Sequence, residues 1–222
     1  MNAKKEVGYK AASLIKDGQI VGLGTGSTTH YFIEKLGERV EKENLKIMGI
    51  PTSYQSFILA KENNIPCTTL NEHEIDIAVD GADEIDPEKN LIKGGGAAHT
   101  LEKIVDYSAK ELIIIADQSK EVKTLGKTPV PLEVIKEAAP QVQKTLKDMN
   151  VESTIRMGVK KDGPVITDNG NFIIDAEFNE ILNPISLEKE LNTIPGVVEN
   201  GIFTEMVDTV IIGTEDGTKI IN

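Results

Sequence analysis

Short apolar runs alternate with amphipathic stretches along the chain as far as residue 125. The apolar runs predict strands, at residues 19–24, 45–50, 75–80 and 111–116. The amphipathic stretches have helical spacing, at residues 28–40, 55–63 and 97–110. Because the strands are too apolar to have a solvated face, this βαβα order predicts an α/β fold: an open, mostly parallel, Rossmann-like sheet covered by helices.

Beyond Gly126 the pattern changes to short β-rich runs around two amphipathic helices. The helices are expected at residues 138–149 and 185–191, and the β-rich runs lie at residues 153–157, 164–167, 172–178 and 197–203. This βαββαβ-like order predicts a second, smaller, ferredoxin-like α+β domain. We therefore expect a Rossmann-like catalytic domain of residues 1–126 plus a returning segment, 204–222, and a small domain of residues 127–203.

The charge of the chain narrows the choice of ligand. The formal net charge is −12 and no block of Lys or Arg interrupts it, which argues against nucleic acid as a partner. A small anionic ligand would need a local positive pocket. The single cysteine, Cys67, rules out an internal disulfide framework. Because no apolar run approaches the roughly 20 residues of a membrane span, we expect a cytoplasmic protein with no membrane partner.

The first predicted strand runs into a glycine- and hydroxyl-rich loop, GLGTGST. The loop resembles a dinucleotide-binding turn, but Ser27 stands where that fingerprint needs its third glycine, and the lysine of a P-loop is missing. What remains is a turn of Thr25, Gly26, Ser27 and Thr28 at the start of a helix, where free N–H groups favour a phosphate. The alternative is that Ser27 or Thr28 only caps the helix.

The third predicted strand ends in DGADEID, which places Asp80 and Asp83 on either side of a glycine turn. Two carboxylates held close together have coupled protonation, which suits acid–base catalysis. A metal site that adds Glu84 and Asp86 is one alternative, although the order of the acids does not match a calcium loop. A purely structural turn is another.

The stretch KGGGAAHTLEK sets a lysine and three glycines before a helix. Gly94, Gly95 and Gly96 leave their N–H groups accessible to a ligand after Lys93. Glu102 lies off the buried face of the helix, near its start, and can lean back over the glycines. Alternatively, this glutamate only complements the helix dipole.

The fourth predicted strand ends in ADQSK, which brings Lys120 to the same edge of the sheet, unless it is simply a solvated charge. These groups together suit one reaction. A glutamate can take a proton from a carbon next to a carbonyl if the neighbouring oxygen is stabilised as its charge develops. Lys93 and the glycine N–H groups could stabilise that oxygen without a metal. The resulting enediolate would exchange an aldose for a ketose.

The motifs GLGTGST, DGADEID, KGGGAA with the Glu-Lys that follows, and ADQSK resemble, in order and spacing, those of the ribose-5-phosphate isomerase type A family. The later TDNGN and IPGVVENGIF are similar to that family as well. The resemblance implies interconversion of ribose 5-phosphate and ribulose 5-phosphate in the non-oxidative pentose phosphate pathway. It also implies no metal or organic cofactor, and a homodimer or homotetramer.

The resemblance further implies a role for each residue of the motifs. Glu102 would be the general base, Asp80 and Asp83 would handle hydroxyl protons and ring opening, and Lys93 would steady the enediolate. The substrate would be contacted by Thr25, Gly26, Ser27, Thr28, Gly81, Ala82, Gly94, Gly95, Gly96 and Lys120.

Two other functions fit parts of this pattern. A non-catalytic sugar-phosphate sensor domain would keep the phosphate loop, would need no base, and would usually carry a DNA-binding module. Another enzyme of similar fold, such as an amino-sugar phosphate isomerase-deaminase or a coenzyme A transferase, would share the sheet. The transferase would form a covalent intermediate on a glutamate, which can be trapped.

Overall fold

The computed structural model describes residues 2–215 and 217–222, and the chain forms two compact units. The first unit comprises residues 1–82, 101–120 and 206–222, and the second comprises residues 83–100 and 121–205. The sequence analysis instead placed residues 83–100 in the first domain. Residues 83–100 lie in the second unit because they supply β4 (Glu84–Ile85) and β5 (Leu91–Ile92), which form a three-stranded sheet with β11 (Ile202–Phe203). Residues 121–126 and 204–205, which were also expected in the first domain, belong to the second unit as well.

The first unit is built on a six-stranded sheet with the order β13-β12-β6-β3-β1-β2. Its strands are β1 (Ile20–Leu23), β2 (Met48–Pro51), β3 (Ile77–Asp80), β6 (Leu112–Asp117), β12 (Thr209–Thr214) and β13 (Gly217–Ile221). All neighbours are parallel except β12 and β13, which form an antiparallel hairpin. The predicted open and mostly parallel sheet, with its returning C-terminal segment, is therefore confirmed.

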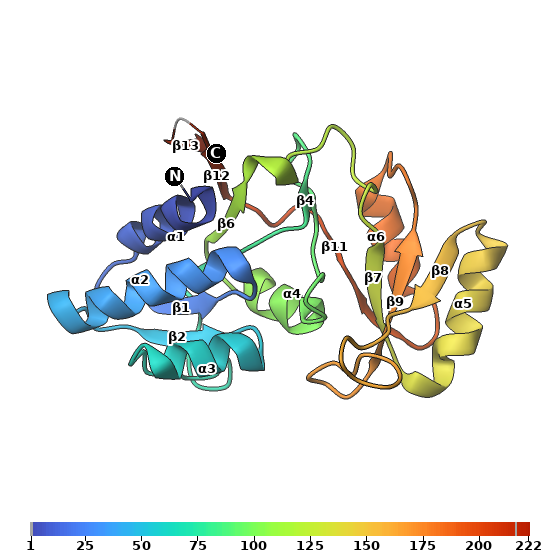
Figure 1. Cartoon of the computed structure of the whole chain (residues 1–222), viewed down its shortest axis with the longest axis horizontal. Coiled ribbons are helices and arrows are strands. Elements are labelled where there is room, and N and C mark those ends of the chain that lie inside the picture. The colour runs from blue at the N-terminus through green and yellow to red at the C-terminus, as the bar shows by residue number, and fades with distance from the viewer. Residues whose placement is uncertain (1, 216) are drawn as a thin grey trace. The chain divides into compact units, whose positions relative to one another are not determined.

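Helices cover both faces of this sheet. On one face α1 (Ala3–Leu14), α2 (Ser27–Glu43) and α3 (Tyr54–Glu62) enclose a core that includes Val21 and Leu23 of β1. Figure 1 shows α1 and α2 side by side along the sheet. Side chains alternate along a strand, so Gly22 faces the other side. There α4 (His99–Tyr107) approaches closely, and a Cβ added at Gly22 would lie 3.0 Å from a methyl carbon of Val105.

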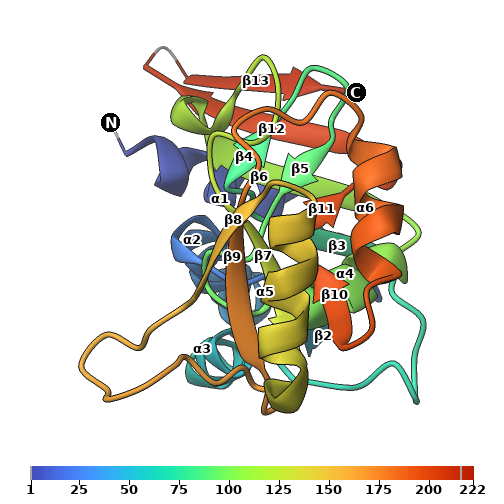
Figure 2. The same cartoon turned by 90° about the vertical axis from the view of Figure 1, so that its right-hand side faces the viewer.

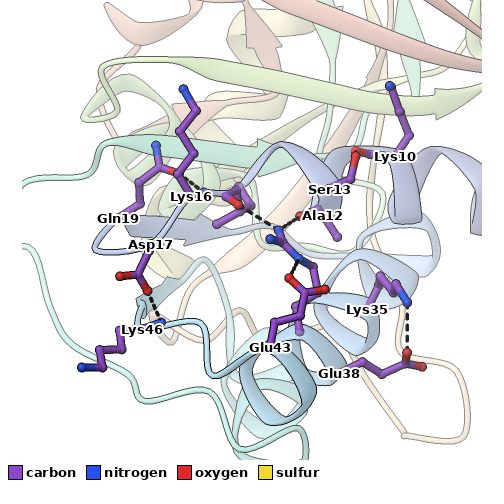
Figure 3. Close-up of polar contacts among 12 residues, drawn as sticks. Lys10, Ala12, Ser13, Lys16, Asp17, Gln19, Lys35, Glu38, Glu43 and Lys46 are labelled. Carbon is purple, nitrogen blue, oxygen red and sulfur yellow. Dashed lines mark hydrogen bonds and ion pairs between the residues drawn. The ribbon is translucent and has the colours of Figure 1, made fainter.

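Arg39 of α2 ties α1 to α2 at the end of α1. Its Nη1 donates to the carbonyl oxygens of Ala12 at 2.6 Å and Ile15 at 2.8 Å, and its Nε donates to Glu43 at 2.9 Å. Figure 3 shows this group, with Ala12 and Glu43 labelled. The last carbonyls of a helix have no partner within the helix, so the guanidinium acts as a C-terminal cap from a neighbouring element.

The second unit contains a four-stranded antiparallel sheet with the order β10-β7-β9-β8. Its strands are β7 (Val130–Val134), β8 (Glu152–Ile155), β9 (Phe172–Glu177) and β10 (Val197–Asn200). The helices α5 (Ala139–Asp148) and α6 (Pro184–Asn192) lie side by side on one face (Figure 2). The chain order β7-α5-β8-β9-α6-β10 with this strand order is ferredoxin-like, as the sequence analysis predicted.

Parts of the second unit differ from the prediction. The run expected as one strand at 197–203 is divided at Gly201 between β10 and β11, which belong to different sheets. A Cβ at Gly201 would lie 2.4 Å from the carbonyl oxygen of Lys93, so only glycine fits at this point of the chain. The run at 164–167 is no strand, because only Pro164 forms a bridge, to Met157.

Strand β7 was not predicted, because Pro131 argues against a central strand. The proline is tolerated because of where the neighbouring ladder ends. Its carbonyl accepts from Gly201 N–H at 2.8 Å, on the side of β10. The ladder with β10 has already ended at the pair of Leu132 and Asn200, so no ladder hydrogen bond is lost.

Two short 3₁₀ helices, η1 (Gln118–Lys120) and η2 (Lys136–Ala138), complete the secondary structure of the described residues. Among these residues, no helix is both long enough and apolar enough to span a bilayer.

Candidate active site

The parallel strands of the first unit end at one edge of the sheet, and several expected site residues lie there. Asp80, the last residue of β3, is fully buried. Its Oδ1 accepts the N–H groups of Thr25 at 3.1 Å and of Gly81 at 2.6 Å. A Cβ added at Gly24 would lie 2.3 Å from this oxygen, so the β1 loop passes the carboxylate only because residue 24 is glycine. Asp80, Thr25 and Gly81 are therefore brought together as expected.

A hydroxyl cluster beside Asp80 joins the β1 and β2 loops. Thr25 Oγ1 lies 2.7 Å from Thr52 Oγ1 and donates to Ser53 Oγ at 2.6 Å. Ser53 also caps α3, in a reciprocal capping box with Ser56. The sequence analysis gave no role to the PTSYQS loop. The available signal was a pair of hydroxyl residues directly after β2, at the edge where β1 also ends.

The start of α2 has the features of an anion site. Its N-cap is Gly26, with φ of +125°, and no side chain caps this helix end in the described structure. Ser27 is exposed and Thr28 is half-buried. The alternative that Ser27 or Thr28 serves as the cap is therefore wrong. First-turn N–H groups with no side-chain cap, together with the positive end of the helix dipole, favour a bound phosphate.

Positive charge gathers near this helix end, although the whole chain is acidic. Lys4 of α1 donates from Nζ to Ser27 Oγ at 3.0 Å. Burial would raise the pKa of Asp117, but hydrogen bonds from Ser119 and the charges of Lys4 and Lys120 lower it below its usual range. The charges of both lysines thus act on Asp117 at the end of β6. The sequence analysis found Lys120 but missed Lys4, because α1 precedes β1 and carries no motif.

Glu102 lies in the first turn of α4, and only 4 % of it is exposed. A glutamate that only complements a helix dipole would normally be solvated. Its burial contradicts the expectation that Glu102 lies off the buried face of the helix, and it favours a specific role over that of a dipole partner. The helix was expected from Ala97 but begins at His99, because Ala97 has a φ of +60°, in the left-handed region, and closes a turn with Gly94.

Ala82, the last residue of the first unit before Asp83, is half-buried.

The remaining expected residues belong to the second unit, where Asp83 and the triglycine loop are in contact. Asp83 Oδ2 accepts Gly95 N–H at 2.8 Å. Gly94 has a φ of +101° and packs so tightly that an added Cβ would lie 2.6 Å from a Pro131 carbon. Gly95 and Gly96 are exposed. Gly94 is therefore packed against its surroundings, whereas Gly95 and Gly96 are accessible to solvent.

Lys93 is buried, with its ammonium group 5.4 Å from the centre of the Phe203 ring. An aromatic face stabilises a cation, and more strongly when both are shielded from water. The Phe203 ring therefore gives this buried amine a favourable neighbour on a side that is shielded from bulk solvent.

The TDNGN segment, residues 167–171, supplies hydrogen-bond donors to Glu133 of β7. This carboxylate is buried, and it accepts hydrogen bonds from Thr167 at 2.8 Å, Asn171 at 2.8 Å and Asn169 at 3.1 Å. Burial would raise the pKa of Glu133, but the hydrogen bonds from Asn171, Thr167 and Asn169 lower it below the ordinary value. The motif therefore supplies hydrogen bonds to a buried carboxylate and fixes the loop that leads from β8 to β9.

Two acids of the alternative metal cluster have structural partners. Glu84 accepts N–H groups from Gly126, at 2.8 Å, and from Thr128. Asp86 Oδ1 accepts the N–H groups of Glu88 at 2.9 Å and Asn90 at 2.8 Å, which closes a turn. Within the described ranges, no group of three or more His, Cys, Asp or Glu side chains is arranged to hold a metal ion.

The chain was compared with known proteins. The sequence model of the ribose 5-phosphate isomerase A family (phosphoriboisomerase A) matches residues 48–217. Ribose-5-phosphate isomerase A of Methanothermobacter thermautotrophicus is 58% identical over 221 residues, covering 100% of this chain and 98% of the relative.

Solved structures give the same relationship. Ribose 5-phosphate isomerase A from Methanocaldococcus jannaschii has a TM-score of 0.97 and 53% identity, covering 99% of this chain and 98% of that one. A D-ribose-5-phosphate isomerase in complex with phospho-erythronic acid also has a TM-score of 0.97, with 52% identity, covering 100% of this chain and 99% of that one.

Proposed function

Since the chain belongs to the ribose 5-phosphate isomerase A family, we propose that it is an enzyme that interconverts D-ribose 5-phosphate and D-ribulose 5-phosphate. Near-complete coverage at 58% identity is the observation that carries this proposal. The anion site at the start of α2, where Lys4 contacts Ser27, suits the substrate phosphate.

We propose that Glu102 is the general base. In the open-chain aldose its carboxylate takes the C2 proton, and the electron pair moves onto the C1 oxygen to give an enediolate. Glu102 then returns the proton to C1, while the proton of the C2 hydroxyl is transferred to the C1 oxygen, which leaves the ketose. Burial of Glu102 supports this role, because packing around the carboxylate can hold it at one position relative to the substrate.

Asp80 and Asp83 are proposed to exchange hydroxyl protons and to open the sugar ring. Asp80 is held rigidly by two backbone N–H groups, and Asp83 by Gly95 N–H. Fixed geometry of this kind favours proton transfer at defined atoms. Lys93 and the N–H groups of the triglycine loop are proposed to stabilise the enediolate, and Gly81 and Ala82 to contact the sugar.

We test this function with the purified protein and ribose 5-phosphate, with a chelator present and arabinose 5-phosphate as the comparison substrate. We expect ribulose 5-phosphate to form, with exchange of the C2 proton with solvent. Binding without turnover would instead favour the sugar-phosphate sensor. Loss of turnover on chelation would contradict metal independence.

For the base, we expect Glu102→Gln to lower kcat by at least about a hundredfold with little change in substrate affinity, because an amide cannot accept the proton. Steady-state kinetics and substrate titration measure the two quantities. Glu137→Gln, on the exposed η2 helix, is the matched control and should keep full activity. Full activity of the Glu102 variant would remove this residue from the mechanism.

We also propose that the protein is a cytoplasmic homo-oligomer that acts in the pentose phosphate pathway. Light scattering should then give a particle mass of two or four times 24.2 kDa.

A further inference from the structure

Arg156 lies directly after β8 and holds the triglycine loop. Its Nη1 donates to the carbonyl oxygens of Gly94 at 2.9 Å and Gly95 at 3.1 Å. Its other edge pairs with Asp175 of β9, through Nε at 2.8 Å and through Nη2. The guanidinium is thereby held in one orientation between a carboxylate and two peptide carbonyls.

These two contacts act on the N–H groups of the loop. The carbonyl of Gly94 shares a planar peptide group with the N–H of Gly95, and the carbonyl of Gly95 shares one with the N–H of Gly96. Fixing an oxygen therefore fixes the direction of the N–H on the other side of the peptide. A cation at the oxygen also polarises the peptide, which makes its N–H a stronger donor.

The loop needs such a support. Gly94 is packed against Pro131, but Gly95 and Gly96 are exposed and lack side chains that could anchor them. Glycine has the greatest backbone freedom of all residues, so unsupported N–H groups would point in many directions. Catalytic stabilisation of an oxyanion requires donors that are aimed before the charge appears.

We propose that Arg156 is a positioning residue for the isomerisation: it aims and polarises the Gly95 and Gly96 N–H groups, so that Gly95 holds Asp83 and Gly96 meets the enediolate oxygen. This inference rests on the proposed function. Arg156 does not itself touch the reacting atoms. The Gly95 contact with Asp83, at 2.8 Å, is the part of this arrangement already present in the structure.

The test compares Arg156→Lys and Arg156→Gln with the wild-type protein. Lysine keeps the charge but not the fork that reaches two carbonyls and a carboxylate, so we expect kcat to fall about tenfold, and about a hundredfold for glutamine. KM should stay within about threefold, because Arg156 is not part of the phosphate site proposed at the start of α2. The chain has one other arginine, and Arg39→Gln is the matched control, expected to keep the wild-type kcat.

Binding of an intermediate analogue separates positioning from a general structural role. Phospho-erythronic acid carries a carboxylate in place of the enediolate, so its affinity should fall in proportion to kcat/KM in the Arg156 variants. The affinity for inorganic phosphate should not change. Thermal melting verifies that each variant is folded at the assay temperature.

Two results would overturn the inference: a folded Arg156→Gln variant with kcat within twofold of wild type, or an equal loss of affinity for phosphate and for the analogue. Failure of the wild-type protein to convert ribose 5-phosphate would instead reject the proposed function. The two failures are therefore distinguishable.

Discussion

At the scale of single residues, the sequence identified the acids and glycines but not their supports. Asp80 and Glu102 lie within motifs that are continuous in the sequence. Thr52, Lys4 and Arg156 instead contact residues that are distant in the sequence and that only the fold brings near. No local pattern distinguishes Lys4 and Arg156 from ordinary surface residues, whereas Thr52 belongs to a pair of hydroxyl residues directly after β2. Periodicity specifies which face a side chain takes, but not which distant loop lies opposite.

Glu133 allows a prediction at this scale. Glu133→Gln should lower the free energy of unfolding by about 1–3 kcal/mol at pH 7, because its amide cannot accept hydrogen bonds from three donors as a carboxylate does. The folded pKa of Glu133 is lowered from 4.5, so its stabilisation is present above that pH and is lost as the pH falls through the folded pKa. The difference between variant and wild type should therefore narrow below about pH 4.5.

Urea denaturation at pH 7 and at a series of pH values below 4.5 measures this difference. The control is Glu137→Gln, since this glutamate is exposed on the neighbouring η2 helix. Its effect should stay within about 0.5 kcal/mol. A difference for Glu133→Gln that is constant across the pH range would contradict the explanation.

At the scale of helices and strands, the long amphipathic and apolar runs predicted their elements well. Strands β4 and β5 were missed because two residues have no measurable period. Strand β7 was missed because a proline weighed against it, although its position beyond the β10 ladder removes the cost. Helix α4 begins later than predicted because Ala97 has a left-handed backbone conformation. Alanine rarely takes this conformation, so the sequence did not indicate it.

The packing of α1 on α2 gives a prediction for Arg39. Arg39→Gln removes the cap on the Ala12 and Ile15 carbonyls and should lower the free energy of unfolding by about 1–3 kcal/mol. Activity per folded molecule should be unchanged. Arg39→Lys keeps the charge but cannot reproduce both contacts, so it should fall between glutamine and wild type in a thermal melt. An unchanged melting temperature for both variants would show that the cap contributes nothing.

At the scale of the molecule, each compact unit is assembled from separate parts of the chain. The first unit needs residues 206–222, because β12 lies between β6 and β13 in its sheet. Val210, Ile211 and Ile212 are fully buried there. Burial of three such side chains contributes about 5–9 kcal/mol, which is comparable to the whole stability of a typical domain.

Ending the chain after Glu205 should therefore give insoluble or unfolded protein. Ending it after Thr214 removes only the edge strand β13 and should leave a folded protein with a lower melting temperature. Solubility on expression and far-ultraviolet circular dichroism compare the two. A soluble, cooperatively folded protein from the shorter form would show that β12 is dispensable.

This division of the first unit has a consequence during synthesis. A ribosome makes the strands of the large sheet in order, but β12 emerges only after the entire second unit has been translated. Until then β6 has an open edge of unpaired peptide groups, a surface to which other nascent chains can add. The large sheet is therefore completed only after residues 206–222 have been translated, and the edge of β6 stays open until then.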